Sequence, residues 1–568
     1  MVCVARKKYV CDFETTTKED DCRVWAYGCM EIGNKKNLKI GTKIEDFMDW
    51  CKKEKCDIYF HNLKFDGSFI VNWLLHNGYT HSDEGLPMTF NTIISNMGQW
   101  YMIDICYGYK GKKKLHTKIY DSLKKLPFSV DVIGKAFNLG SNKVEVDPEF
   151  YTRERSENHE ITEEEYLYIY SDLEVMVDAL EIQFNQGLKA MTSGSDSLKG
   201  YKDVIGTKTF EKLFPILSLE DNEEIRWCYR GGFTWLNERY ANKDIGGGIV
   251  FDVNSLYPSQ MYYQPLPFGK PIKFNGKYVE DEDYPLYTQH IRCEFILKEG
   301  YIPTIQLKNQ GLMFKQNEYL KSSKGETVDL YLTNIDLKLI EEHYDLYDVE
   351  YVGGWKFRSK VGMFKEFIDK WMLVKATNKG AIRMLAKLML NSLYGKFATN
   401  PKVTGKVPYL KEDGSNGFTL PKDENGNVVD EFKDPVYTPI GVFVTSYARN
   451  LTIRTAQKCY DRIIYCDTDS IHLEGTEIPE VIKDVIDDNK LGYWKHESTF
   501  QRARFIRQKT YIEEIDGKLH VICAGMPDRI KEKVTWENFH VGFSANGKML
   551  PKQVKGGVVL EDTMFTLK

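Results

Sequence analysis

The chain has 568 residues, of which 42% are hydrophobic and 28% are charged, and its formal net charge is −5. This length is too great for one hydrophobic core, so several domains are expected. The charge balance excludes a structural nucleoprotein that binds nucleic acid through overall basic charge. The 12 cysteines form no C-x-x-C pair and no signal peptide is evident, which is typical of a soluble intracellular protein with reduced thiols.

The first third of the chain alternates strand-like and helical segments. Alternation of this kind predicts an α/β domain that ends near residue 190. The predicted strands are residues 6–17, 56–67 and 98–109, and the predicted helix is 162–184. Residues 191–200 (MTSGSDSLKG) are rich in Ser and Gly and are interpreted as a connection.

Four acids and a tyrosine recur at meaningful spacings in this first domain. Asp12 and Glu14 are two residues apart on a predicted strand and share one face. Asp66 follows a predicted strand and precedes Gly67, while Tyr168 and Asp172 lie four residues apart on a helix face. Each alone is also explained as an exposed strand acid, a turn residue or a helical surface pair.

The second part of the chain is richer in strands. A strand is predicted within residues 246–261, followed by about 110 residues of mixed sequence and a helix near 380–397. Residues 410–435 are polar and turn-dense, which favours an exposed hairpin or loop. Strands are expected to resume over 436–448, and residues 552–568 are expected to form a small β tail.

Two aspartates interrupt the apolar stretch IIYCDTDSIHL. Asp467 and Asp469 are separated by Thr468 alone, and the flanking residues favour strands. A hairpin turn explains the pattern, since Asp and Ser are turn formers. A divalent cation also explains it, because the cation offsets the repulsion of two carboxylates and requires hard oxygen ligands.

A third aspartate ends another predicted strand, in the segment GGGIVFDVNSLYPSQM. Asp252 lies where this strand leads into Asn-Ser and Pro258, a position that also suits a helix N-cap. If both strand ends lie at one edge of a sheet, their acids could hold two metal ions about 3.5–4 Å apart for phosphoryl transfer.

The helix near 380–397 supplies opposite charge. Eight Lys or Arg residues and no Asp or Glu occur from Lys375 to Lys411. At 100° per residue, Arg383, Lys387, Asn391 and Tyr394 share one face, opposite an apolar stripe. A solvated basic face is one explanation, but solvated helices usually interleave acids, so the pattern favours an anionic ligand such as a triphosphate.

Three ordered motifs, DVNSLYPSQM, KLMLNSLYGKF and YCDTDS, resemble those of family B DNA polymerases, closest to the protein-primed phi29-type branch from small Bacillus phages. The resemblance covers essentially the whole chain. It implies that Asp252, Asp469 and the carbonyl of Val253 bind the catalytic metals and that Asp467 assists. It also implies that Tyr257 excludes a ribose 2′-hydroxyl. The resemblance further implies nucleotide contacts from Lys375, Lys387 and Tyr394, and the shared helix face adds Asn391 as a candidate.

The same resemblance implies a 3′–5′ proofreading exonuclease in the first domain. Asp12, Glu14, Asp66 and Asp172 would hold two metals, and Tyr168 would orient the attacking water. Residues suited to holding a frayed single strand are Thr15, Tyr59, His61, Asn62, Phe65, Phe69, Ser122 and Leu123. For Tyr59 and Phe69, ordinary core packing remains an alternative.

Two further segments are candidates for positioning DNA. In CYRGGFTW, Arg230 could bind a phosphate, Tyr229 could pack on a sugar, and Gly231 with Gly232 allows close backbone approach. In RARFIRQKTY, the family motif implies that Lys509 and Tyr511 hold the primer terminus. The arginines of this segment suit either DNA contact or a basic strand face. Such contacts give affinity rather than sequence preference.

The fold class implied is α/β multidomain: a ribonuclease-H-like exonuclease followed by a right-hand polymerase with two insertions. The expected boundaries are 1–189 exonuclease, 190–263 palm, 264–363 first insertion (terminal-protein region), 364–398 fingers, 399–436 second insertion (strand displacement and processivity), 437–523 palm and 524–568 thumb. Two departures from the family are expected: a longer segment at 411–435 and a shorter one after Tyr511.

The implied activity is DNA-directed DNA synthesis for a viral genome in the host cytoplasm. It would be protein-primed, processive and strand-displacing, with two Mg²⁺ ions per active site, for which Mn²⁺ could substitute. The partners would be template and primer DNA, dNTPs and a terminal protein, with a monomeric enzyme and no membrane. A conventional primer-extending polymerase is the alternative. A nuclease with a degenerate second half is disfavoured, because Tyr257, Lys387 and Asp469 are all present.

Overall fold

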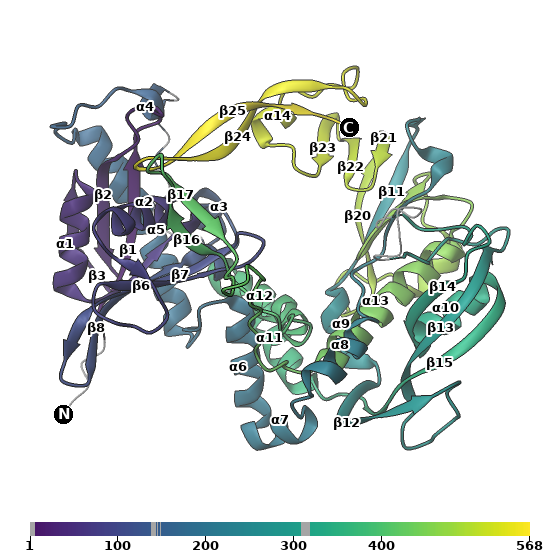
Figure 1. Ribbon diagram of the computed structural model, residues 1–568. Helices are drawn as coiled ribbons and strands as arrows, with labels where there is room; N and C mark the ends of the chain where they lie inside the picture. The colour runs from purple at the N-terminus through teal and green to yellow at the C-terminus, as the bar shows by residue number, and fades with distance from the viewer. Residues whose placement is uncertain (1–5, 138–143, 145, 148, 308–317) are drawn as a thin grey trace.

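The computed structural model describes residues 6–137, 144, 146–147, 149–307 and 318–568. Small parts of the predicted exonuclease segment and first insertion therefore lie outside the described residues. The polypeptide is arranged as an arch (Figure 1): the N-terminal sheet lies on one side, two further sheets lie on the other, and the C-terminal hairpin crosses between them. Among the described residues, no helix is both long and apolar enough to cross a membrane.

The N-terminal part is built on one eight-stranded sheet with the order β3-β2-β1-β4-β8-β7-β6-β5. β1 pairs antiparallel with β2 and parallel with β4, which in turn is parallel to β8. The strands are β1 Lys8–Thr15, β2 Val24–Glu31, β3 Asn34–Gly41, β4 Asp57–Phe60, β5 Thr80–His81, β6 Thr89–Ile94, β7 Trp100–Lys110 and β8 Lys113–Asp121. The helices are α1 Ile44–Glu54, α2 Leu63–His76, α3 Val130–Ala136, α4 Glu149–Thr152 and α5 Glu163–Asn185. The α/β prediction for this region is confirmed.

Helix α5 begins where the sequence provides a complete capping box. Thr162 accepts the N–H of Glu165, and the Glu165 carboxylate accepts the N–H of Thr162. The helix packs on β1 and β2, with Ile169 and Leu173 buried. This packing fixes the inner face of α5, which carries the buried Tyr168 and Asp172, against β1, an interior strand of the sheet.

Two segments differ from the prediction. Of the residues 191–200 that were expected to form a connection, 193–200 belong to helix α6 (Ser193–Ile205). The hydroxyl of Thr192 caps the helix, Tyr201 is fully buried, and Asp196 forms a buried ion pair with Lys125 at 2.6 Å. Tertiary packing therefore overrides the weak helix propensity of Ser and Gly.

The expected strand over 436–448 is also wrong, because this sequence begins helix α13 (Thr438–Lys458). Its β-branched and aromatic residues suggested a strand, yet a continuous apolar run does not distinguish a buried strand from a buried helix. Pro439 occupies the first turn, where the missing N–H costs nothing. The helix packs against α9, α12, β12 and β18, so it is buried on several sides at the centre of the molecule.

The central palm sheet has the order β20-β11-β19-β18-β9 and is antiparallel throughout. Its strands are β9 Thr234–Leu236, β11 Gly248–Val253, β18 Ile463–Asp467, β19 Ser470–Glu474 and β20 Trp494–Phe500. Helices α8 Leu219–Arg226, α9 Leu256–Tyr263 and α13 accompany the sheet. Short 3₁₀ helices lie elsewhere in the chain: η1 Ser122–Lys124, η2 Glu238–Tyr240 and η3 Glu480–Val485. Residues from distant parts of the chain meet here, because β11 lies between β19 and β20.

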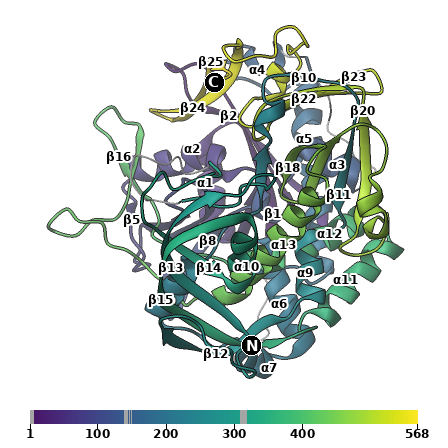
Figure 2. The ribbon, with the colours of Figure 1, turned by 90° about the vertical axis from the view of Figure 1, so that its right-hand side faces the viewer.

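The first insertion forms a separate four-stranded sheet with the order β12-β15-β13-β14, which Figure 2 shows in front of the palm. Its elements are β12 Leu266–Asn275, β13 Leu286–Leu297, β14 Val328–Thr333, α10 Asn334–His343 and β15 Tyr344–Lys360. It has its own small core, which includes Ile291, Phe295, Leu330 and Ile340.

A helical unit connects the two sides: α6, α7 Thr207–Leu213, α11 Lys365–Thr377 and α12 Gly380–Phe397. The helix predicted near 380–397 is confirmed as α12. The remaining elements are β10 Asp244–Ile245, β16 Val407–Leu410, β17 Asn416–Thr419, β21 Arg502–Arg507, β22 Thr510–Ile515, β23 Lys518–Cys523, α14 Asp528–Lys531, β24 Ser544–Val554 and β25 Gly557–Thr566. The predicted hairpin in the second insertion is β16–β17 and the predicted β tail falls within β24–β25.

Candidate active sites

The three palm aspartates meet at one edge of the central sheet. Asp252 is the next-to-last residue of β11 and lies directly opposite Ser470, and Asp467 is also paired with Ser470 across the β18–β19 hairpin. The hairpin turn is tight, with Thr468 at φ +59°, and the N–H of Val253 donates to the carbonyl of Asp469 at 2.8 Å. The hairpin interpretation of IIYCDTDSIHL is confirmed, and it brings Asp469 beside Asp252.

The electrostatics of this pair show why a cation would fit. Burial, then the neighbouring Asp469 and Glu497, raises the pKa of Asp252 to about 7. The pKa of Asp469 is also raised, chiefly by burial. Two partly buried carboxylates, one of which raises the pKa of the other, are hard oxygen donors suited to a divalent metal such as Mg²⁺.

Asp467 differs from its two neighbours because its charge is already balanced. The ammonium of Lys509 lies 2.6 and 2.9 Å from its two carboxylate oxygens. The hydroxyl of Tyr465 donates to Oδ2 at 3.0 Å and that of Thr234 donates to Oδ1 at 3.2 Å. This arrangement suits an assisting carboxylate that positions Lys509, rather than a direct metal ligand.

The nucleotide-binding candidates come from α9, α11 and α12. The rings of Tyr257 and Tyr394 stack at a centroid separation of 4.0 Å. On α12, Arg383, Lys387 and Asn391 are exposed while Leu385, Met389 and Leu393 are buried, so the predicted amphipathic faces are confirmed. The pKa of Lys375 is lowered by burial and by nearby cations, with Lys387 the largest of these.

Sequence reasoning missed two charged residues at this site, Lys495 and Glu497 on β20. Lys495 is directly opposite Asp252 in the β11–β20 pair, and a bulge follows it at Glu497. The signal in the sequence was weak, since a Lys and a Glu two residues apart occur in many exposed strands. Only the register of the sheet brings them beside Asp252.

In the candidate exonuclease site, β1 presents Asp12 and Glu14 on one face while Phe13 packs into the opposite core. The turn interpretation of Asp66 is wrong: it lies in the first turn of α2 and is buried. Burial, followed by the charge of Asp12, raises the pKa of Asp66 well above its usual range. Burial, then Glu14 and Asp172, raises the pKa of Tyr168.

The acids are therefore near one another in couples, Asp12 with Asp66 and Glu14 with Asp172 around Tyr168. Within the part of the chain that the structure describes, no three His, Cys, Asp or Glu side chains form a ready-made metal-binding group. The oxygen-rich chemistry of both couples fits hard divalent cations. The assignment of two metals to these four acids stays a prediction.

The single-strand candidates divide into exposed and packed residues. Asn62 is exposed, with φ +76°, and Phe65 and Thr15 are half-buried. Tyr59 and Phe69 are core rings, Tyr59 stacked on Tyr120 at 5.3 Å and Phe69 beside the tip of the β24–β25 hairpin. His61 is held by Ser122 at 3.0 Å and by the carbonyl of Phe128 at 2.7 Å, and the half-buried Leu123 follows Ser122. DNA binding by these residues stays a prediction.

The segment Tyr229–Gly232 lies against the catalytic hairpin. A Cβ at Gly232 would come 2.6 Å from the Thr468 side chain, whereas Gly231 has open space. The guanidinium of Arg230 donates to the carbonyl of Gln306 at 2.6 Å. Gly232 is thus explained by packing, while Gly231 suits the predicted phosphate approach.

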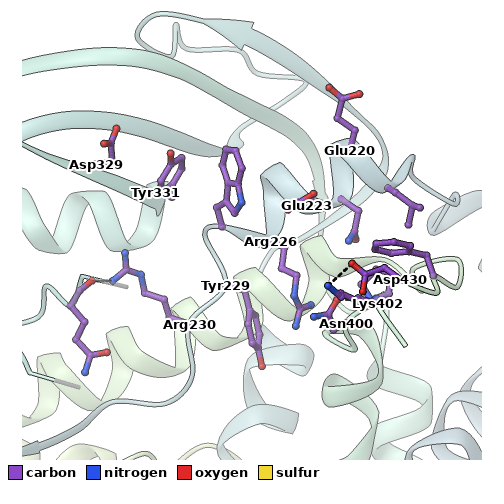
Figure 3. A pocket seen from close by; sticks show the side chains of 16 residues that line it. Glu220, Glu223, Arg226, Tyr229, Arg230, Asp329, Tyr331, Asn400, Lys402 and Asp430 are labelled. Atoms are coloured by element: carbon purple, nitrogen blue, oxygen red, sulfur yellow. Dashed lines mark hydrogen bonds and ion pairs between the residues drawn. The ribbon is translucent and has the colours of Figure 1, made fainter. Parts of the chain in front are cut away.

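A pocket of about 970 Å³ opens beside this segment (Figure 3). Arg226, Tyr229 and Arg230 line one side, and Lys402 with Asp430 lines the other, joined by an ion pair of 2.7 Å. The pocket therefore lies between the Tyr229–Gly232 segment and the second insertion.

Tyr511, the other primer-terminus candidate, stacks on Phe505 at 4.6 Å, and Arg502 and Arg504 are ion-paired with Glu514 and Asp244.

These two carboxylate sites on a multidomain α/β chain define a family B DNA polymerase, and the chain belongs to that family: residues 48–488 match the family of DNA polymerase type B, organellar and viral. Within it, the chain is of the phi29 type. It is 64% identical to the DNA polymerase of Bacillus phage B103, over 99% of this chain and 100% of that one. It is 62% identical to that of Bacillus phage phi29, over 99% of both. It also superimposes on the phi29 polymerase solved with primer-template DNA and incoming nucleotides, with a TM-score of 0.95 and 61% identity over 99% of this chain and 100% of that one. The chain is thus a DNA-directed DNA polymerase, an enzyme type for which 3′–5′ exonuclease activity is characteristic.

Proposed function

We propose that this polymerase copies a viral genome in the cytoplasm of its bacterial host, starting from a protein primer and proofreading its product. The observation that carries the synthetic role is the meeting of Asp252 and Asp469 at the end of adjacent strands, faced by the cations of α11 and α12. Relatives of this type are phage enzymes, and the superimposable phi29 polymerase was solved with primer-template DNA and nucleotides.

Asp252, Asp469 and the Val253 carbonyl would hold two Mg²⁺ ions, or Mn²⁺ in their place. Such ions, when bound, favour ionisation of a primer hydroxyl and stabilise charge on the leaving pyrophosphate. Tyr257 and Tyr394 form a stacked wall on which the sugar and base of the incoming nucleotide would rest. Lys375 and Lys387 would bind its triphosphate, since phosphates are stabilised by fixed cations.

In the first domain, Asp12, Glu14, Asp66 and Asp172 would hold the metals that activate water for removal of a 3′-terminal nucleotide. Tyr168 is buried next to Glu14 and Asp172 and keeps its proton, because its pKa is raised. Its hydroxyl is therefore suited to donate a hydrogen bond that orients the attacking water. Lys509, held by Asp467, and Tyr511 would position the primer terminus at the synthetic site.

Processive, strand-displacing synthesis is supported by contacts that close the arch. Asn416 in the second insertion donates to the carbonyl of Ser68 on α2 at 2.8 Å and to Oε1 of Gln553 on β24 at 3.0 Å. Asn72 on α2 donates to Gly414 and Asn416, and accepts the N–H of Gly556. The second insertion, the exonuclease domain and the C-terminal hairpin thus meet at one buried point, which would enclose DNA held by a monomeric enzyme.

Protein priming is the step that separates this proposal from a conventional primer-extending polymerase. The first insertion, with its own sheet and core, presents a surface on which a terminal protein could dock, with the protein offering a hydroxyl in place of a primer 3′-end. The test incubates the enzyme with Mg²⁺, a labelled dNTP, the terminal protein encoded with it and origin DNA. A labelled protein–nucleotide adduct is expected; extension of primed DNA without any adduct would favour the conventional alternative.

The two activities are tested with a primed template in Mg²⁺, with and without dNTPs. Extension with dNTPs and shortening without them are expected. Replacing residues 411–433 by a short Gly-Ser linker should spare short extensions but reduce product length and synthesis through duplex. Unchanged long products from that variant would contradict the role of the second insertion.

A further inference from the structure

The residue that the known motifs do not account for is Lys495, at the start of β20. It is opposite Asp252 in an antiparallel pair, with Lys495↔Asp252 in register. Directly opposed residues place their side chains on the same face, with Cβ atoms about 4.5–5.5 Å apart. The lysine therefore extends over the same face of the palm as the catalytic carboxylate.

The side chain of Lys495 is exposed, so its ammonium group is open to an approaching ligand. Its charge lowers the pKa of Asp252 and, weakly, also that of Lys375 on α11. A charge that acts on both groups is within electrostatic reach of both the palm carboxylate Asp252 and Lys375 of the fingers helices. This is the space that a triphosphate bridging those two sets must cross.

The opposite side of that space is already cationic. Lys387 and Arg383 both contribute to the lowered pKa of Lys375, and Arg383 donates to the carbonyl of Lys375 at 2.5 Å, which keeps α11 and α12 together at this point. These cations approach from the fingers alone. Lys495 adds a cation from β20 on the palm side to the cations of α11 and α12, so a polyphosphate would be bound from both the palm and the fingers.

We propose that Lys495 is a further positioning residue of the polymerase site, which binds the β- and γ-phosphates of the incoming nucleotide and the pyrophosphate that leaves. This inference rests on the proposed assignment of Asp252 and Asp469 to the synthetic centre. In the reaction, the primer 3′-oxygen forms a bond to the α-phosphorus and loses its proton to solvent. The bond from the α-phosphorus to the bridging oxygen breaks, and pyrophosphate departs with that electron pair. Its increased negative charge is what the lysine stabilises.

The test compares Lys495→Ala and Lys495→Arg with the wild type in single-nucleotide incorporation and in pyrophosphorolysis of a primer with inorganic pyrophosphate. Lys483→Ala is the matched control, because Lys483 is an exposed palm lysine on η3, outside β20, whose ammonium forms an ion pair with Glu480. Lys495→Ala is expected to raise KM for both dNTP and pyrophosphate about 3- to 10-fold, with a smaller effect on kcat. Lys495→Arg should restore KM to within about twofold, because it keeps the charge.

Degradation of single-stranded DNA by the same preparations checks that each variant is folded. Unchanged KM for both substrates in Lys495→Ala would overturn the inference, as would a loss of kcat that Lys495→Arg does not restore. Failure of the wild type to extend a primer would instead refute the proposed function, so the two failures are distinct.

Discussion

The buried contact at Asn416 gives a quantitative test of how the arch is closed. Asn416→Ala removes three hydrogen bonds: two donated to Ser68 and Gln553, and one accepted from Asn72 at 3.1 Å. Asn416 is 1% exposed, so water does not replace its amide while the hairpin stays docked. At roughly 1 kcal/mol for each bond lost, the docked state is destabilised by about 3 kcal/mol, which is about a 100-fold shift toward the undocked hairpin.

The assay measures product length on a primed circular template under single-binding conditions, with a heparin trap. Asn416→Ala should give markedly shorter products and weaker synthesis through duplex, with normal addition of the first few nucleotides. Hydrogen exchange of residues 407–419 should be faster, because the contact protects this hairpin. Asn425→Ala, an exposed amide of the same insertion, is the matched control. Wild-type product lengths in Asn416→Ala, with faster hydrogen exchange, would refute the link between docking and processivity.

Four other outcomes are expected. Asp469→Ala should abolish extension and leave degradation of single strands, since the two sites are on different sheets; loss of both activities in a folded variant would contradict this. Asp12→Ala combined with Asp66→Ala should remove degradation while extension persists, and continued degradation on a sequencing gel would show a wrong assignment. Tyr257→Val should admit ribonucleotides, measured as the ratio of kcat/KM for dNTP and rNTP, and an unchanged ratio would exclude Tyr257 as the gate. Finally, the pKa of Asp252 is about 7 in the folded state against an ordinary 3.8, so the folded state binds more protons than the unfolded state. The metal-free protein should therefore lose stability as pH rises from about 4 to 7. In EDTA, the Tm of Asp252→Asn should exceed that of the wild type at pH 8 and match it near pH 4; equal Tm values at both pH values would mean that folding does not destabilise the ionised carboxylate.

The candidate catalytic carboxylates stand out in the sequence because each is locally anomalous. Asp467 and Asp469 interrupt a strand pattern, and Asp252 ends one, so burial alone does not explain them. The polar and apolar faces of α12 were also predicted from the sequence, since a helix places every third or fourth residue on one side. These signals lie within short segments, and the structure confirms the local geometry of each.

Other features depended on contacts between distant segments. Helix α13 was expected to be a strand, because its β-branched and aromatic residues carry a propensity that burial on several sides overrides. Lys495 had only a weak signal in the sequence, and the register of β20 against β11 is what placed it opposite Asp252. Likewise, in the sequence Asn416 is an ordinary residue of a turn-rich segment. Only in the folded chain does its amide join the second insertion to Ser68 of α2 and Gln553 of β24.

The sequence by itself determined the chemistry of this protein: which acids, cations and aromatic rings occur, and their order within segments of helix and strand. Local periodicity and turn propensity were sufficient for most of these segments, though not for α6 and α13, because they act over a few residues. Only the tertiary structure decided which of these groups meet, such as Asp467 with Lys509, which are 42 residues apart. Strand register and helix docking depend on packing summed over the whole chain, and no short stretch contains that information.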